Sequence, residues 1–257
     1  MAQSLWSREE HILALNLYWQ IPFGKMHKGN PKIIDLANLI GRTPSSVGMK
    51  LGNFGRLDPA LKQRGISGLK HGAKGEKDVW DDFLSNPEEL AYESEQIRAK
   101  WLNSTVEEIN DIKTDQLPTV GSERERIVKT RVNQNIFRNR ILSAYDFRCC
   151  ITGLNDPRLL IAGHIIPWSK DSKNRLNPLN GLCMNRLHDK LFEDGLMWID
   201  ENYHIHFSNR FLENDIKNPS VAYSWIKQYD GNKIITPKGF EPSLEFLEVH
   251  AKTHGHA

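Results

Sequence analysis

Residues 158–195 alternate apolar runs with turn residues in an order that few folds can accommodate. The segment "RLLIAGHIIPW" is rich in leucine and isoleucine and is stopped by Pro167, which predicts a strand that ends in a turn. After the turn residues Asn177, Pro178 and Asn180, the short apolar segment "NGLCM" predicts a returning strand. "NRLHDKLFEDG" then has apolar residues on one helical face and ends at Gly195, which predicts a short helix. The expected unit is therefore strand, polar loop, strand and helix.

The N-terminal part of the chain carries start and stop signals of short helices. Ser7 and Glu10 have the spacing of a capping box, which predicts a helix that continues to about Trp19. A second helix is expected over 31–41, because it starts with a proline at its first turn and ends at a glycine. A third is expected to follow Thr43 as its N-cap, with Pro44 as its first residue.

The second and third of these helices have the spacing of a helix-turn-helix. Their inward residues are expected to be Leu36, Ala37, Ile40, Val47 and Leu51. The third helix is then expected to display its polar residues outward, toward DNA: Ser45, Ser46, Lys50 and Asn53. The alternative is a plain helical hairpin inside a small all-α core.

The chain of 257 residues is long enough for two modest domains. The segment "KTDQLPTVGSE" contains the proline, glycine and serine of a linker. We therefore expect an α+β protein with a helical DNA-recognition domain over 1–117, a linker over 118–125 and a second domain over 126–257.

Charge is distributed unevenly along the chain. The formal net charge is only +2, which by itself does not indicate a nucleic-acid-binding protein. Between Glu123 and Arg148, however, seven Lys and Arg residues face three acidic ones. An amphipathic helix is expected there, and its cations Arg131, Arg138 and Arg140 are candidates for phosphate contacts.

Composition excludes several classes of protein. The chain is 39% hydrophobic and 26% charged, and no apolar tract approaches the roughly 18 residues of a membrane span. The N-terminus lacks the features of a signal peptide, so a cytoplasmic protein is the expectation. Three cysteines, two of them adjacent, can form neither a disulfide framework nor a four-cysteine zinc site, and we expect reduced thiols.

Three ordered blocks carry a resemblance to a known family. "FRNRILSAYDFRCCITGL", "GHIIPWS" and "NPLNGLCMNRLHDKLFEDGL" resemble the HNH nucleases, which have the ββα-metal fold. The resemblance covers roughly Arg131 to Asp200. The N-terminal segments "WSREEHILALNLYWQIPFGKMHKGNP" and "GRTPSSVGMKLGNF" resemble the region that precedes such nucleases in predicted bacterial restriction proteins.

The resemblance implies a catalytic role for three residues. Phosphodiester hydrolysis needs a deprotonated water, neutralised charge on phosphorus and a stabilised leaving group, which a histidine and a divalent metal can share. In the family pattern the histidine before Ile-x-Pro is the general base, and His164 matches it. Asn180 matches the asparagine that holds the loop and orients the base. His188 matches the helix residue that binds metal.

One position departs from the family pattern. Many HNH nucleases have an acidic residue or a histidine directly before the base, where it shares the metal, but this chain has Gly163. Asp189 is the first candidate for the second ligand and Asn177 the next, although either could be satisfied locally by backbone groups. So few protein ligands leave much of the shell to water and phosphate, which favours Mg²⁺ or Mn²⁺.

The sequence therefore predicts a metal-dependent endonuclease acting on double-stranded DNA, of restriction or phage-defence type, with an N-terminal domain that would choose the target, for example by a modified base. A homodimer would allow both strands to be cut, because each chain has one site. Two alternatives stay open: a DNA-binding protein whose HNH fold is inactive, and a nuclease for RNA or branched DNA.

Overall fold

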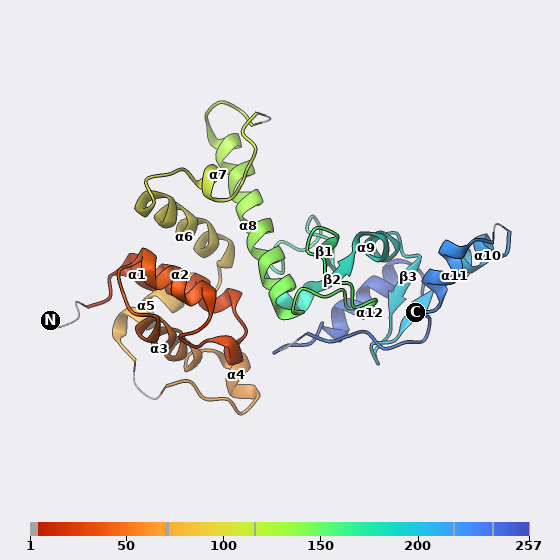
Figure 1. The fold of residues 1–257 in the computed structure, drawn as a ribbon, viewed down its shortest axis with the longest axis horizontal. Coiled ribbons are helices and arrows are strands. Elements are labelled where there is room, and N and C mark those ends of the chain that lie inside the picture. Colours follow the sequence, from red (N-terminus) through yellow and green to blue (C-terminus); the bar gives the residue numbers. More distant parts are fainter. Residues whose placement is uncertain (1–4, 70–71, 116, 218, 238, 257) are drawn as a thin grey trace. The chain divides into compact units, whose positions relative to one another are not determined.

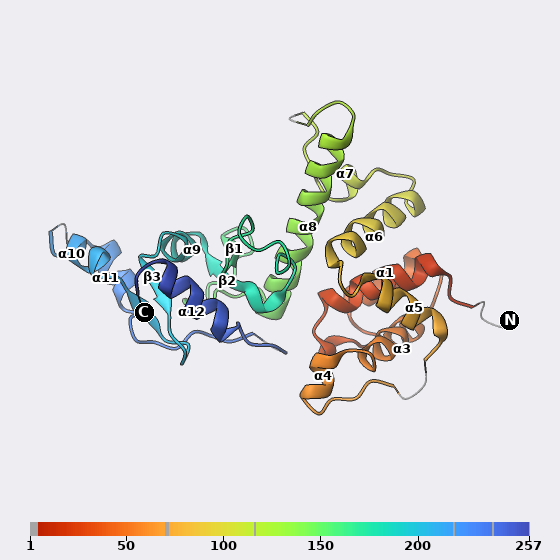
Figure 2. The same ribbon diagram turned by 180° about the vertical axis from the view of Figure 1, so that it is seen from behind.

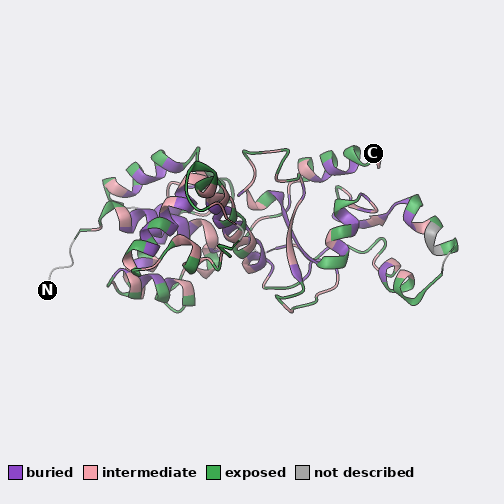
Figure 3. Ribbon diagram, turned by 90° about the horizontal axis from the view of Figure 1, so that it is seen from above, coloured by how far each residue is buried: buried purple, intermediate pink, exposed green. Residues whose placement is uncertain are grey.

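The computed structural model describes residues 5–69, 72–115, 117–217, 219–237 and 239–256. Helices predominate, and two short antiparallel strand pairs lie in the C-terminal part of the chain, so the α+β class is confirmed (Figures 1 and 2). The chain divides into two compact units, 1–136 and 137–257, which are described separately. Within each unit the buried residues gather on the inner faces of the elements (Figure 3). No helix among the described residues is long and apolar enough to cross a membrane.

The N-terminal unit is helical. Its elements are α1 (Arg8–Gln20), η1 (Phe23–Lys25), α2 (Pro31–Leu39), α3 (Pro44–Gly55), α4 (Pro59–Gln63), α5 (Lys74–Phe83), α6 (Pro87–Trp101), α7 (Val106–Ile109) and the first part of α8 (Ser122–Ala144). Helices α1, α2, α3, α5 and α6 enclose one apolar core. Helix α8 begins inside the range expected as a linker and continues into the second unit.

The predicted helix signals are confirmed in this unit. The Ser7 side chain accepts a hydrogen bond from the Glu10 N–H, and the Glu10 carboxylate accepts one from the Ser7 N–H, completing the capping box of α1. Thr43 caps α3, and Gly41 lies in the left-handed region at φ 65° between the two helices. The residues expected to point inward from α2 and α3 are all buried: Leu36, Ala37, Ile40, Val47 and Leu51.

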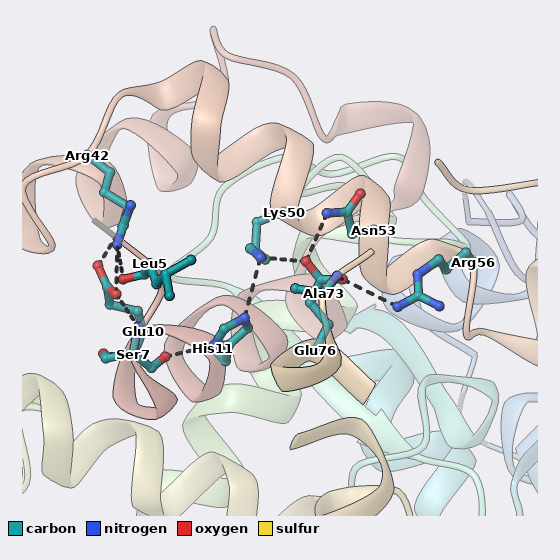
Figure 4. A network of polar contacts seen from close by, with 10 residues as sticks. All are labelled: Leu5, Ser7, Glu10, His11, Arg42, Lys50, Asn53, Arg56, Ala73 and Glu76. Atoms are coloured by element: carbon teal, nitrogen blue, oxygen red, sulfur yellow. Dashed lines mark hydrogen bonds and ion pairs between the residues drawn. The ribbon is translucent and has the colours of Figure 1, made fainter. Parts of the chain in front are cut away.

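The outward display expected of Lys50 and Asn53 is wrong. Lys50 is 7% exposed, and its Nζ lies 2.5 Å from an Oε1 of Glu76, which is fully buried (Figure 4). Asn53 donates to the same oxygen at 2.9 Å, and Arg56 donates to the other carboxylate oxygen at 3.4 Å. A buried carboxylate needs such partners because unpaired burial is costly. Helix α5 thus takes the polar face of α3 that was assigned to DNA.

The polar network continues from Glu76 into α1 (Figure 4). Burial alone would raise the pKa of Glu76, but the hydrogen bonds from Lys50 and Asn53 hold it below its usual value. The His11 Nδ1 lies 2.7 Å from the Ser7 carbonyl oxygen and therefore carries its proton, so the unprotonated Nε2 accepts from the Lys50 Nζ at 3.4 Å. One charged cluster therefore joins α1, α3 and α5.

Lys50→Met is expected to lower the free energy of unfolding by about 3 kcal/mol, since it leaves the buried Glu76 without its closest cation. The measurement is urea unfolding of the full chain, followed by circular dichroism. Asp81→Ala removes the partner of Lys77 in an exposed ion pair on α5, and this control is expected to cost less than about 1 kcal/mol. Similar losses for the two variants would show that the network contributes little.

The C-terminal unit contains the predicted strand, loop, strand and helix. Its elements are the end of α8, β1 (Leu160–His164), η2 (Pro178–Asn180), β2 (Gly181–Asn185), α9 (Arg186–Glu193), β3 (Met197–Ile199), β4 (Ile205–Phe207), α10 (Asn209–Lys217), α11 (Val221–Lys227) and α12 (Leu244–Thr253). Strands β1 and β2 pair antiparallel, as do β3 and β4. Gly195, at φ 64°, follows the end of α9. The three cysteines are free and buried.

Candidate active site at the end of the β1–β2 hairpin

The hairpin places its polar residues by register. His164 pairs with Gly181 at one end, and Leu160 pairs with Asn185 at the other, after which the chain enters α9 directly. A Cβ at Gly181 would lie 2.4 Å from Ile141 and 2.9 Å from Phe137 of α8. Only glycine lets α8 pack this closely against the hairpin opposite His164.

His164 has a defined tautomer. Its Nε2 lies 2.9 Å from the carbonyl oxygen of Arg175, which can only accept, so Nε2 carries the proton. The ring stacks on Phe137 with centroids 3.7 Å apart and meets the edge of Trp168 at 5.4 Å. In the neutral ring Nδ1 is then unprotonated. It has no hydrogen bond to any residue that the structure describes, and it is not sealed from solvent as the Nε2 of His188 is.

The surroundings of His164 keep it neutral near pH 7. Burial lowers the pKa of His164 below 6.5, and the charge of Arg175 lowers it further, while the hydrogen bond to the Arg175 carbonyl opposes both effects. A neutral imidazole with a fixed tautomer and an available nitrogen can accept a proton from water.

Asn180 ties the loop after β1 to the start of β2. Its side chain is fully buried; Oδ1 accepts from the Ile166 N–H at 2.7 Å, and Nδ2 donates to the Ile166 carbonyl at 3.1 Å. Nδ2 also lies 3.2 Å from the Asn174 carbonyl. Asn180 therefore fixes the backbone two residues beyond His164. Asn177 makes local bonds instead: its oxygen accepts from the Leu179 N–H, and its amide donates to the Asn174 side chain.

Asp189 on α9 approaches the strand residue that precedes His164. A Cβ at Gly163 would lie 2.4 Å from the Asp189 Oδ1, so the space beside this glycine is filled by a carboxylate. Burial raises the pKa of Asp189 to about 6, with a further contribution from Glu193. The missing acidic residue at position 163 is thus matched by an acidic residue that reaches the same place from the helix.

His188 lies in a different environment from its neighbour. It is fully buried, its Nδ1 contacts the Asn185 side chain, and its ring lies 5.5 Å from both Trp225 and Tyr229. Burial lowers the pKa of His188 to about 4, and its Nε2 has no hydrogen-bond partner among the described residues. Successive helix residues point about 100° apart, so His188 faces α11 while Asp189 faces β1.

The cations assigned to phosphate contacts serve different purposes. Arg138 donates to the carbonyls of Leu160 and Pro157, and Arg140 donates to that of Leu176, so both hold the backbone of the C-terminal unit. Arg131 is exposed and forms no hydrogen bond or ion pair with any residue in the described ranges. In the N-terminal unit Ser45 is exposed and Ser46 partly so.

Arg175 is a functional candidate that the sequence did not reveal. Its carbonyl sets the tautomer of His164, its Nε donates to the Trp168 carbonyl, and its guanidinium lies 5.1 Å from the Trp168 ring. The only sequence signal was its place in the polar loop between the two strands. Among the described residues no cluster of three or more His, Cys, Asp or Glu could hold a metal ion.

A neutral histidine with an available nitrogen, on a hairpin whose helix brings up a carboxylate, is an arrangement capable of general-base hydrolysis. Residues 149–200, which include β1, β2 and α9, match the family model described as HNH endonuclease. The chain therefore contains an HNH domain, which confirms the expectation from the three sequence blocks. HNH domains are in general nucleases that act on nucleic acid with a divalent metal ion. No curated protein matches the chain.

Two buried histidines of this unit are expected to make its stability depend on pH. Burial lowers the pKa of both His188 and His250 to about 4. In the unfolded chain these histidines take up a proton near pH 6.5. The stability that each contributes by staying neutral in the fold is therefore fully present above pH 6.5 and is lost as the pH falls toward 4. Each histidine is expected to cost about 2 kcal/mol at pH 5, about 1.4 kcal/mol per pH unit.

Protection factors of the α9 and α12 amides in hydrogen exchange, taken between pH 7.5 and 5, measure this loss. His250→Gln retains a donor for the Phe192 carbonyl and is expected to remove about half of the slope. The exposed His27 supplies the control variant His27→Gln, which should leave the slope intact. A flat profile in the unaltered protein would contradict the prediction.

Proposed function

We propose that this protein is a metal-dependent endonuclease that hydrolyses phosphodiester bonds in double-stranded DNA. The observation that carries the proposal is the state of His164: Nε2 is fixed on the Arg175 carbonyl, and Nδ1 is unprotonated at the edge of an HNH hairpin. A base of this kind, matched to the operating pH, deprotonates an attacking water.

The residues of the proposed site have separate roles in this reaction. His164 takes the proton of water at Nδ1, and the hydrogen bond from Nε2–H to the Arg175 carbonyl stabilises the imidazolium that forms. Asn180 is a positioning residue, since it holds Ile166 and with it the loop that follows the base. The products expected from the family chemistry are a 3′-hydroxyl and a 5′-phosphate.

The donor atoms present fit a divalent cation that prefers oxygen. Asp189 would hold it, because its carboxylate occupies the space beside Gly163, next to the base in the chain. Asp189 is the single protein ligand proposed, and the described part of the chain holds no cluster of three or more possible ligands. Water and substrate phosphate would therefore complete the shell, which favours Mg²⁺ or Mn²⁺. When bound, such an ion neutralises charge on phosphorus and stabilises the leaving oxygen.

We assign target choice to the N-terminal helices and a restriction or phage-defence role in the cytoplasm to the whole chain. The two-helix geometry of α2 and α3 and the exposed Ser45 support this assignment, whereas Lys50 and Asn53 no longer do. Reading of a modified base fits the same arrangement. Two copies of the chain would cut both strands, since each carries one site.

Supercoiled plasmid, methylated or unmethylated, tests the proposal in the presence of Mg²⁺, Mn²⁺ or EDTA. Nicking or linearisation only with metal is expected, and a difference between the plasmids would identify modification dependence. Structured RNA and branched DNA are run in parallel. Cleavage confined to those substrates would overturn the choice of duplex DNA. Duplex binding without any cleavage would support an inactive HNH fold instead.

A further inference from the structure

A pocket of about 470 Å³ lies at the opposite end of the hairpin from His164. Its walls come from the loop before β1, the start of α9 and the region of α11: Thr152, Leu154, Leu159, Asn185, Arg186, Leu187, Trp225 and Tyr229. His164 and the Leu160–Asn185 pair are four residues apart on the strand, or roughly 13 Å. The pocket is therefore separate from the proposed site of hydrolysis.

The pocket walls are apolar and aromatic. Four large apolar side chains remain between 37% and 47% exposed around it: Leu154, Leu159, Leu187 and Trp225. A group of this kind, unlike scattered single residues, indicates a binding surface. The rings of Trp225 and Tyr229 lie 5.9 Å apart at 84°, so the pocket offers both a face and an edge to a planar ligand.

The available polar groups of the pocket are hydrogen-bond donors. The Thr152 Oγ1 already accepts from the Leu154 N–H and, at 3.4 Å, from the Asn185 amide, so its proton is left to donate. Arg186 is exposed and forms no hydrogen bond or ion pair with any described residue. The matching ligand has a flat ring, acceptor atoms on its edge and a negative charge beside it. Those are the properties of a nucleotide.

We propose that this pocket holds one unstacked base of the nucleic-acid substrate, with Arg186 on the neighbouring phosphate. The proposal rests on the proposed function, according to which the C-terminal unit binds a nucleic-acid substrate. The base stacks on Trp225, and the Thr152 hydroxyl donates to an acceptor on its edge. Aromatic side chains hold unpaired bases in this way with little dependence on sequence, and a base that is already extrahelical avoids the cost of unstacking.

The experiment measures binding by the full chain in EDTA, so that it does not depend on cleavage. The probes are short fluorescent duplexes with randomised flanks, carrying a central extrahelical nucleotide or, at the same place, an extrahelical abasic residue. The unaltered protein is expected to bind the duplex with the base about 5- to 100-fold more tightly, which is the range of aromatic stacking. Arg186→Ala is expected to weaken both complexes equally and to reduce the salt slope by about one.

Variants on α11 provide the matched comparison. Trp225→Ala is expected to abolish the preference for the base, and Trp225→Phe, which keeps a ring, to retain most of it. Val221→Ala changes a residue of the same helix that is 87% exposed and does not line the pocket, so the preference should persist.

Equal binding of the two probes by the unaltered protein would overturn the pocket assignment without any variant being needed. A preference that survives in Trp225→Ala would overturn it as well. Failure of the unaltered protein to bind either duplex would overturn the proposed function itself, together with this inference.

Discussion

His164→Ala is expected to lower the rate of metal-dependent plasmid cleavage by about two to four orders of magnitude, the usual contribution of a general base. Binding of the duplex should be retained, because His164 acts on the attacking water and is not assigned to DNA contacts. The measurement is the initial nicking rate at saturating Mg²⁺, with Kd from fluorescence anisotropy in EDTA. The base must be neutral, so activity of the unaltered protein should decline on the acid side of pH 6.5, below the lowered pKa of His164.

His204→Ala provides the control for this prediction. His204 belongs to the same unit and is partly exposed, and its Nδ1 lies 3.6 Å from Asp200. The nicking rate of His204→Ala is expected to stay within about threefold of that of the unaltered protein, because substitutions at partly exposed residues away from the site have small effects. If His164→Ala cleaves within tenfold of the unaltered protein, another group activates the water and the assignment fails.

Local signals were sufficient to predict α1, α2, α3, α8, α9 and the hairpin, but not every other helix of the described chain. The capping box at Ser7 and the Thr43–Pro44 start involve residues within one turn of each other, so their chemistry is visible in the chain itself. The strand, loop, strand and helix of residues 160–193 followed from apolar runs and turn residues in the same way.

The burial of Lys50 could not be predicted from local pattern, because it depends on a partner 26 residues away. On the helical period alone Lys50 falls on a polar face, and only the packing of α5 brings the buried Glu76 against it. The pocket could not be predicted from local pattern either. Its aromatic wall at Trp225 lies about sixty residues after β1, whereas Thr152 and Leu154 on another wall precede β1. Long-range packing decides both cases, and no periodicity reports it.

The sequence assigned both His188 and Asp189 to the metal, and which of the two binds it stays a prediction. The family pattern pointed to the histidine, yet neighbouring residues on a helix face different directions, and the sequence does not show which face meets the strand. The space at Gly163 is the observation that favours Asp189, since a Cβ there would lie 2.4 Å from the Asp189 Oδ1. In the proposed site, Gly163 takes the place of a ligand and leaves room beside the strand for the Asp189 carboxylate.

Asp189→Asn is expected to reduce cleavage by about 100-fold or more and to raise the Mg²⁺ concentration needed for half-maximal activity, because second-shell changes alone already cost 10- to 100-fold. The same variant should be more stable than the unaltered protein at pH 7.5 in EDTA. In the unaltered protein the pKa of Asp189 rises from 3.8 to about 6 on folding, so the ionised carboxylate costs at most about 3 kcal/mol of stability above pH 6. This loss is recovered as the pH falls from 6 toward 4 and Asp189 takes up a proton. A gain in stability with a loss of activity distinguishes a functional acid from a structural one.

His188→Gln is the matched variant on the neighbouring residue of α9. We expect it to cleave within about tenfold of the unaltered protein, with an unchanged Mg²⁺ requirement. It should lose stability, because the His188 ring lies against Trp225 and Tyr229 and its Nδ1 contacts the Asn185 side chain. Titrations of the nicking rate with Mg²⁺ and Mn²⁺, paired with thermal unfolding in EDTA, separate the two effects. If His188→Gln changes the Mg²⁺ concentration needed for half-maximal activity and Asp189→Asn does not, the metal ligand is His188. Helix α9 must then turn its buried face toward β1 when the metal binds. Full activity of the unaltered protein in EDTA would remove the metal ion from the reaction altogether and leave Asp189 as a carboxylate that acts on water or on His164 directly.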